Sequence, residues 1–342
     1  MDIDKDGLPA LASVIKGQRV DVVVHTAGPF QQRTNPTLLE ASIAAGTPYV
    51  DVCDEPPLCA KSKLLHGEAV QADISAVTAA GIWPGASALM AAEAVKELRR
   101  LESDNDDKEQ DELMSPCEGE KVELSFFTAG TGNAGATIVS ATFLLLCQPA
   151  LTFLRGSKVD AEPWTSPRDV DFGAGVGVRT VRLLDNPDVY TLHESLRIPS
   201  LSSRFATAPG IWNQLFGALK TVVPRGVLGD AALMQKVSLF SLPIIRAVDK
   251  FVGATNAMRV DAFGKKGSHV TFSVTHADLE QCVGLATAAF ALELLQENEN
   301  GERLEAGVFY PSDLPVKSRR AILERVKTNS ILWEFRSRNK IK

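Results

Sequence analysis

Two carboxylates, Asp51 and Glu55, lie four residues apart at the end of a short apolar stretch. A carboxylate in that setting can orient an amide, hold a substrate amine or act as a general acid or base with a shifted pKa. The structural alternative is that Asp51 caps a turn and that Glu55 begins the next helix, ahead of Pro56 and Pro57. The residues alone leave both interpretations open.

Other reactive side chains give weaker signals. The five histidines lie in unrelated contexts, so no Ser-His-Asp order is supported. His25 stands inside an apolar stretch and is typical of a packed core histidine, whereas His276 follows a predicted strand. The five cysteines contain no C-x-x-C pair, so no metal site is predicted.

The elements that position the two carboxylates alternate between strand and helix. Residues 22–24 are β-branched and are soon followed by a Gly-Pro pair, which is typical of a strand buried on both faces. A helical pattern then ends at Gly46, and residues 49–52 and 75–78 are two further short strands. This order predicts a parallel α/β sheet, in which 22–26 and 49–52 are neighbours and ligands lie beyond the carboxyl ends of the strands.

Three motifs in this region resemble those of the saccharopine dehydrogenase-like oxidoreductases. They are A-G-P-F after the first strand, Y-V-D-V-x-x-E around the second, and G-x-x-P-G after the third. Their order and spacing match together, and the likeness continues to G-V-F-Y-P near the end, so that it covers most of the chain. The resemblance implies an NAD(P)-dependent oxidoreductase that acts on an unidentified small substrate in a cleft between two domains.

The resemblance also implies roles for individual residues. Asp51 and Glu55 are the expected catalytic carboxylates, and the loops at the strand ends are expected to border NADP or NAD, where glycines allow close backbone approach. A second glycine-rich loop is expected to line the substrate side of the cleft. The expected cofactor-binding residues are Thr26, Ala27, Gly28, Pro29, Phe30, Gly81, Pro84 and Gly85, and the substrate-cleft residues are Gly130, Thr131 and Gly132.

That second loop is also a literal G-x-G-x-x-G between a strand and a helix, and Asp160 follows at the position of a ribose-binding acid. We predict that it is not the dinucleotide site. The segments around Val260 and Val270 flank a Gly-Lys-Lys-Gly turn and predict a β-hairpin, which does not form a parallel crevice. A strand at 122–128 lying parallel to one that holds Asp160 would favour the alternative, a phosphate cradle.

The beginning of the chain differs from a whole dinucleotide-binding domain, which normally opens with a strand and a G-x-G-x-x-G turn. Here a polar turn and a helix over residues 8–15 come first, so we interpret the chain as truncated, with its own activity and cofactor binding left open. The expected fold class is α/β. A partial Rossmann-type parallel-sheet domain, 1–118 joined by 305–342, accompanies an α+β domain, 119–304, with a mixed or antiparallel sheet.

Composition limits the class of protein. The chain has 342 residues, of which 45% are hydrophobic and 23% charged, as is ordinary for a soluble globular protein of two domains. The net charge of −6 argues against a nucleic-acid binder, which needs a basic face. The odd number of cysteines indicates reduced thiols in an intracellular compartment, cytoplasmic or organellar, and no targeting segment is visible.

Two apolar segments support an alternative function. Polar residues interrupt 136–154, which favours a buried core helix over a membrane span. Residues 231–252 predict an amphipathic helix, more typical of a core element than of a dimer or lipid-facing surface. Its apolar face holds Leu233, Val237, Phe240, Ile244 and Val248. The alternative is a non-catalytic or membrane/lipid-associated scaffold that retains the oxidoreductase fold. The expected partners are a small-molecule substrate, with a homodimer and peripheral membrane association as further options.

Overall fold

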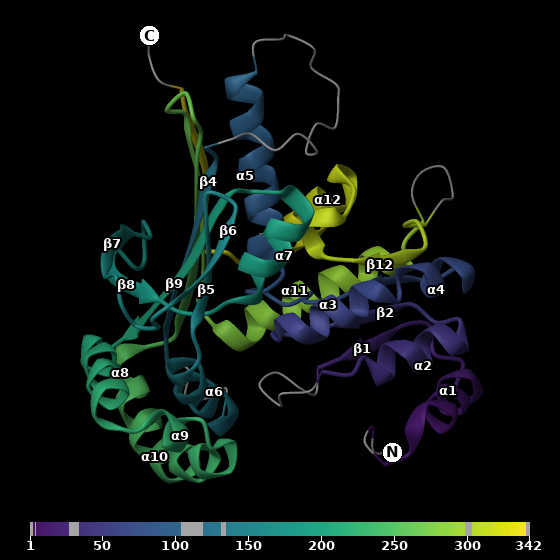
Figure 1. The fold of residues 1–342 in the computed structure, drawn as a ribbon, viewed down its shortest axis with the longest axis horizontal. Coiled ribbons are helices and arrows are strands. Elements are labelled where there is room, and N and C mark those ends of the chain that lie inside the picture. Colours follow the sequence, from purple (N-terminus) through teal and green to yellow (C-terminus); the bar gives the residue numbers. More distant parts are fainter. Residues whose placement is uncertain are drawn as a thin grey trace. The chain divides into compact units, whose positions relative to one another are not determined.

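The computed structural model (Figure 1) describes residues 3, 5–26, 34–103, 119–130, 135–297 and 303–339. The chain forms two compact units, each of which combines a β-sheet with helices. Unit 1 contains Met1–Leu89 and Val283–Val326, and unit 2 contains Met90–Cys282 and Lys327–Lys342. The divisions fall within two helices, α5 (Ala86–Glu102) and α11 (Leu279–Leu295).

Unit 1 is built on a four-stranded parallel sheet in the order β1-β2-β3-β12. Its strands are β1 (Val23–His25), β2 (Tyr49–Asp51), β3 (Ser75–Val77) and β12 (Gly307–Phe309). Its other helices are α1 (Gly7–Gly17), α2 (Thr37–Ala45), α3 (Pro56–Leu64), α4 (His66–Gln71), α12 (Val316–Val326) and the short 3-10 helix Pro311–Asp313. The predicted parallel pairing of 22–26 with 49–52 is confirmed, and it places His25 opposite Asp51.

Local sequence accounts for these elements. β2 and β3 are buried along their whole length, as short apolar stretches between helices predict. α2 ends at Gly46, whose left-handed backbone (φ 69°) glycine adopts without strain. Apolar side chains from the helices and the sheet then pack into a core cluster formed by Leu39, Tyr49, Ala69, Ile74, Ala76 and Val308.

Unit 2 is built on a nine-stranded mixed sheet. At its centre, β4 (Lys121–Ala129) pairs in parallel with β9 (Ser200–Ala208) and antiparallel with β10 (Thr255–Phe263). β10 and β11 (His269–His276) form the predicted hairpin, which is thereby confirmed. The α/β fold class, with a parallel sheet and a separate mixed sheet, is confirmed as well.

The remaining elements of unit 2 lie around this centre, with α6, α8, α9 and α10 gathered at one end of the sheet (Figure 1). The strands are β5 (Ala150–Leu154), β6 (Ser157–Ala161), β7 (Arg168–Asp171), β8 (Val178–Leu183) and β13 (Leu332–Arg338). The helices are α6 (Ala136–Cys147), α7 (Pro187–Leu196), α8 (Gly210–Val222), α9 (Arg225–Leu228) and α10 (Ala231–Val252).

Two expectations about the apolar segments are corrected. Residues 136–154 are not one core helix, because α6 ends at Cys147 and the following residues form β5, which pairs with β6. α10 forms as predicted, but its apolar face is not core, since Phe240 is 83% exposed and Ile244 is 58% exposed. Helical periodicity identifies an apolar face without stating what covers it.

The division at the end of the chain differs from the expected boundaries, which joined 305–342 to the first domain. β13 pairs along its whole length with β11, which places the last residues in unit 2. α12 lies in unit 1, as expected, whereas most of α11 also belongs to unit 1 although the expected boundary placed it in the second domain. The assignment of the last residues depends on pairing between strands that are far apart in the sequence, and no local sequence pattern predicts that pairing.

One buried ion pair in unit 2 links α5 and α7 with the residue that precedes β4. Arg99 of α5 donates from Nε and one terminal nitrogen to the two carboxylate oxygens of Glu120, at 2.9 and 2.8 Å. The same terminal nitrogen donates to the carbonyl of Leu196 at the end of α7, at 3.0 Å. Both charged side chains are buried. Such a pair is expensive to break, because the remaining charge stays out of water.

We therefore expect Glu120→Gln to lower the free energy of unfolding of unit 2 by about 3 kcal/mol, measured by urea denaturation. The matched control is Glu97→Gln, which removes the partner of Arg100 in an ion pair whose arginine is largely exposed. That change should lower the free energy by less than about 1 kcal/mol. Equal effects of the two changes would contradict the assigned role of the buried pair.

Candidate functional site

The carboxyl ends of β1, β2 and β3 meet at one edge of the unit 1 sheet, because the three strands run parallel. Asp51 ends β2, and its side chain is buried. Its carboxylate accepts the backbone N–H groups of Cys53, at 2.9 Å, and Ala79, at 2.8 Å, and the hydroxyl of Thr78, at 3.1 Å. Asp51 therefore ties the end of β2 to the turn that follows β3, as the capping alternative predicted.

This setting opposes ionisation of Asp51 and favours it at the same time. Burial raises the pKa of the carboxyl group. The N–H donors of Ala79 and Cys53 and the charge of His25 act in the other direction, but the net pKa of Asp51 stays above its ordinary value. A carboxylate that is enclosed in this way is suited to fix the turn after β2 against the turn after β3.

His25 is a residue of this edge that the sequence assigned to the core. Its Nδ1 lies 2.9 Å from the hydroxyl of Tyr49, and its Nε2 is buried and finds no hydrogen-bond partner among the described residues. Burial raises the pKa of Tyr49, and the charge of Asp51 raises it further. The predicted pairing of 22–26 with 49–52 was the signal that could have placed His25 here.

Glu55 and two cysteines form the turn after β2. Glu55 is the N-cap residue of α3, and its carbonyl accepts the N–H groups of Leu58 and Cys59 at 3.0 and 3.1 Å. The thiols of Cys53 and Cys59 are buried 3.9 Å apart. A hydrogen bond with Cys59 and burial together raise the pKa of Cys53 far above its ordinary value, so that the thiol stays protonated and unreactive.

The loop between β3 and α5 contains the predicted Gly81, Pro84 and Gly85. A Cβ added to Gly85, whose φ is +132°, would overlap the carbonyl oxygen of Gly81. That carbonyl accepts the N–H of Ala86 at 3.0 Å, and the next carbonyl along accepts the N–H of Ser87 at 2.9 Å. The loop therefore needs its glycines for its own folding, and it already binds the first N–H groups of α5.

The structure locates only some of the other predicted site residues. Thr26 follows β1 directly and is exposed. Ala27, Gly28, Pro29, Phe30, Thr131 and Gly132 lie outside the described residues. Gly130 directly follows β4. A Cβ added there would overlap the carbonyl oxygen of Gly253, so its lack of a side chain permits close backbone packing.

The G-x-G-x-x-G motif of unit 2 does not stand in a dinucleotide-binding arrangement. Asp160 lies on β6, which pairs antiparallel with β5. The parallel neighbour of β4 is β9, and its other neighbour is the β10 strand of the hairpin. The arrangement that would have favoured a phosphate cradle is therefore not the one observed.

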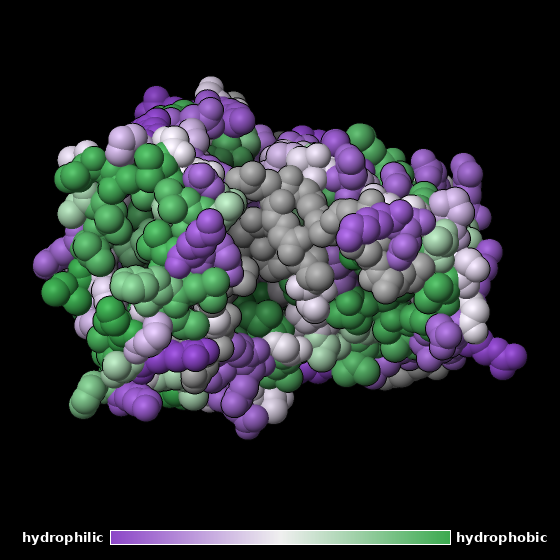
Figure 2. Space-filling view, turned by 90° about the horizontal axis from the view of Figure 1, so that it is seen from below, coloured by the Kyte–Doolittle hydropathy of each residue, from purple (hydrophilic) through white to green (hydrophobic). Residues whose placement is uncertain are grey.

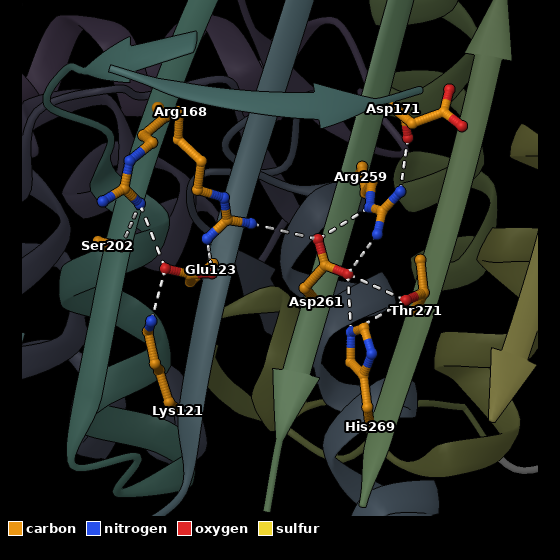
Figure 3. Close-up of polar contacts among 10 residues, drawn as sticks. Lys121, Glu123, Arg168, Asp171, Ser202, Arg259, Asp261, His269 and Thr271 are labelled. Carbon is orange, nitrogen blue, oxygen red and sulfur yellow. Dashed lines mark hydrogen bonds and ion pairs between the residues drawn. The ribbon is translucent and has the colours of Figure 1, made fainter. Parts of the chain in front are cut away.

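A second polar cluster, missed by the sequence analysis, lies on the unit 2 sheet (Figure 3). Glu123 of β4 and Asp261 of β10 stand directly opposite each other in the antiparallel ladder, and both side chains are buried. Like charges in that position repel each other. Arg168 contacts both carboxylates and thus bridges them.

Further donors complete the cluster. Lys121 reaches Glu123 at 2.7 Å, and Arg204 reaches it at 3.5 Å. Asp261 accepts two hydrogen bonds of 2.8 Å from Arg259, one of 2.9 Å from Thr271, and lies 2.9 Å from the Nε2 of His269. Cations outnumber the two carboxylates, so this face of the sheet is locally positive.

The pKa values in this cluster follow from these contacts. Burial alone would raise the pKa of Asp261, but hydrogen bonds and charge from Arg259, together with bonds from His269 and Thr271, hold it below its ordinary value. Burial lowers the pKa of Lys121, and the neighbouring arginines lower it further. The sequence signal was the two acidic residues within otherwise apolar alternation, but their pairing needed the register of the sheet.

A parallel α/β unit joined to a unit with a large mixed sheet is the architecture that the sequence motifs predicted, and comparison with solved structures confirms that resemblance for the fold. The chain is similar to saccharopine dehydrogenase (L-Glu forming) from Saccharomyces cerevisiae, with 13% identity, a TM-score of 0.60, and coverage of 99% of this chain and 88% of that one. It is also similar to homospermidine synthase from Legionella pneumophila, solved in complex with NAD, with 10% identity, a TM-score of 0.58, and coverage of 93% and 76%. No family model matches the chain, and no curated protein matches its sequence.

The Gly85 geometry generates a prediction about folding. Gly85→Ala should lower the free energy of unfolding by about 1–3 kcal/mol more than Gly135→Ala does, measured from urea denaturation midpoints. Both glycines have positive φ, but a Cβ at Gly135 would meet no described atom within 4 Å. The control therefore isolates the clash with Gly81 from backbone strain. Equal destabilisation by the two changes would disprove the clash.

The lowered pKa of Asp261 generates a second prediction. Ionised Asp261 stabilises the folded state above the unfolded pKa of about 4, and this contribution is lost as pH falls through the lower folded pKa. The difference in unfolding free energy between the wild type and Asp261→Asn should thus be largest near neutral pH and should shrink below about pH 4. Asp160→Asn, on an exposed side chain, is the control and should change the midpoint little. A difference that does not vary with pH would contradict this account.

Proposed function

We propose that the protein is an NAD(P)-dependent oxidoreductase that acts on a small molecule. The observation that carries the proposal is the convergence of β1, β2 and β3 on one sheet edge, where open α/β sheets bind their ligands. The similar fold of a homospermidine synthase solved in complex with NAD supports it.

The residues at this edge fit a dinucleotide better than those of the unit 2 glycine motif. At this edge the ends of three parallel strands converge, as they do where open α/β sheets bind ligands. In unit 2, by contrast, the strand before the glycine motif pairs antiparallel with β10, so that successive strand ends do not converge there. We assign cofactor binding to Thr26, residues 27–30, Gly81, Pro84 and Gly85, and we retain Gly130, Thr131 and Gly132 as predicted substrate contacts.

The bound nicotinamide would supply the hydride chemistry. Within the chain, we assign proton transfer to Glu55, the residue that caps α3 in the turn after β2. Asp51 acts as a positioning residue, since its carboxylate is occupied by donors from Cys53, Thr78 and Ala79. It holds the turn after β2 and the turn after β3 in the arrangement that the cofactor would meet.

The decisive experiment is titration of the protein with NADH and with NADPH, followed by nucleotide fluorescence. We expect one of the two to bind with a Kd on the order of micromolar, in the range of typical KM values. Gly85→Ala should weaken binding, whereas Gly135→Ala should not. A folded protein that binds neither nucleotide at millimolar concentration would overturn the proposal and would favour a non-catalytic scaffold.

A second variant tests the role of Glu55. In a screen of small carbonyl and imine compounds for nucleotide consumption, Glu55→Gln should lower turnover by roughly 10²–10⁴-fold. Its affinity for the nucleotide should be unchanged, because the side chain is assigned to proton transfer. Loss of nucleotide binding, with turnover per bound nucleotide intact, would contradict the assignment.

A further inference from the structure

The end of unit 2 formed by α8, α9 and α10 exposes a large apolar surface. Figure 2 shows apolar side chains gathered over this end of the molecule. Phe240 and Phe251 are the most prominent, with 83% and 92% of their surface exposed. Singly exposed apolar residues are common on proteins, but a contiguous group marks a surface that contacts another apolar phase.

The exposed apolar residues form a stripe along each of two helices, α10 and α8. On α10, Leu233, Phe240, Ile244 and Phe251 recur at helical spacing and form one outward stripe. The opposite side of α10 packs against α6 and buries Met234 and Ser238. α8 adds a second exposed stripe that includes Ile211 and Val222. The apolar surface therefore combines the exposed faces of two helices, each of which packs against α6.

Charge indicates what this face contacts. Residues 210–252 contain five Lys or Arg and two Asp, a net charge of +3, although the whole chain carries −6. Two of the cations, Lys220 and Arg225, are paired with Glu162. Along α10, Lys236, Arg246 and Lys250 are exposed beside the apolar stripe. Cations beside an apolar stripe are typical of helices that lie at an anionic lipid surface.

Two other occupants fit less well. A symmetric contact with a second copy would bring the same positive surfaces together, which is unfavourable. α10 is also long and apolar enough, by composition, to span a bilayer. A span would separate it from α6 and would place three exposed cations in the bilayer, which is costly.

We propose that the α8–α10 surface docks peripherally on an anionic lipid surface. Phe240 and Phe251 enter the boundary between headgroups and acyl chains, and Lys236, Arg246 and Lys250 contact the lipid phosphates. α6 and the sheet of unit 2 remain outside the membrane, because α10 keeps its packing against α6.

Co-sedimentation with vesicles tests the proposal. The protein should bind vesicles of phosphatidylcholine with phosphatidylserine and should bind phosphatidylcholine alone much more weakly. The double change Phe240→Ser and Phe251→Ser should lower the partition coefficient by roughly tenfold or more. The matched control is Leu64→Ser on α3, a residue that is 81% exposed elsewhere in the chain, and it should bind as the wild type does.

A charge variant separates the contribution of the exposed lysines from that of the exposed phenylalanines. Lys236→Glu with Lys250→Glu should remove the preference for phosphatidylserine, by roughly fivefold for each lysine, whereas Lys16→Glu on α1 should not. Circular dichroism confirms that each variant is folded. Three results would overturn the proposal: no sedimentation with either vesicle, resistance of bound protein to carbonate extraction, or a stable dimer in gel filtration that the double serine variant converts to monomer.

Discussion

A buried carboxylate must be surrounded by donors, because its transfer out of water is otherwise prohibitive. Both units depend on this constraint. In unit 1, Asp51 accepts hydrogen bonds from two backbone N–H groups and a hydroxyl, and it thereby joins the ends of β2 and β3. In unit 2, Glu123 and Asp261 face each other across a ladder and require bridging by Arg168. The donors then have only one satisfactory arrangement, which fixes the loops and strands that carry them.

The same constraint has opposite consequences in the two units. At Asp51 the donors are mostly backbone groups, which carry no counter-charge, so burial prevails and the pKa is raised. At Asp261 the donors include a guanidinium, so charge prevails and the pKa is lowered. The first arrangement shapes the edge of the parallel sheet where β2 and β3 end. The second gives an ionised network on the sheet of unit 2, in which each carboxylate contacts more than one cation.

The elements that the sequence predicted correctly all have local signals. The helix end at Gly46 follows from one glycine, the hairpin of β10 and β11 from a turn between alternating strands, and the parallel sheet from its strand–helix order. The placement of β13, the pairing of Glu123 with Asp261 and the position of His25 all depend on register between distant segments. The outward face of α10 was missed because the pattern of a stripe is the same whether core or lipid covers it.

Glycine motifs illustrate why function rests on topology more than on composition. Gly130 and Gly85 both occur in loops that resemble nucleotide-binding turns, yet each is required by nearby backbone, Gly253 in one case and Gly81 in the other. Close packing of the chain against itself and close approach of a phosphate demand the same residue. What distinguishes the two loops is the sheet behind them. Only the loop at Gly85 follows an all-parallel sheet, in which successive strand ends converge on one edge. A ligand can use that convergence, whereas a hairpin ladder offers none.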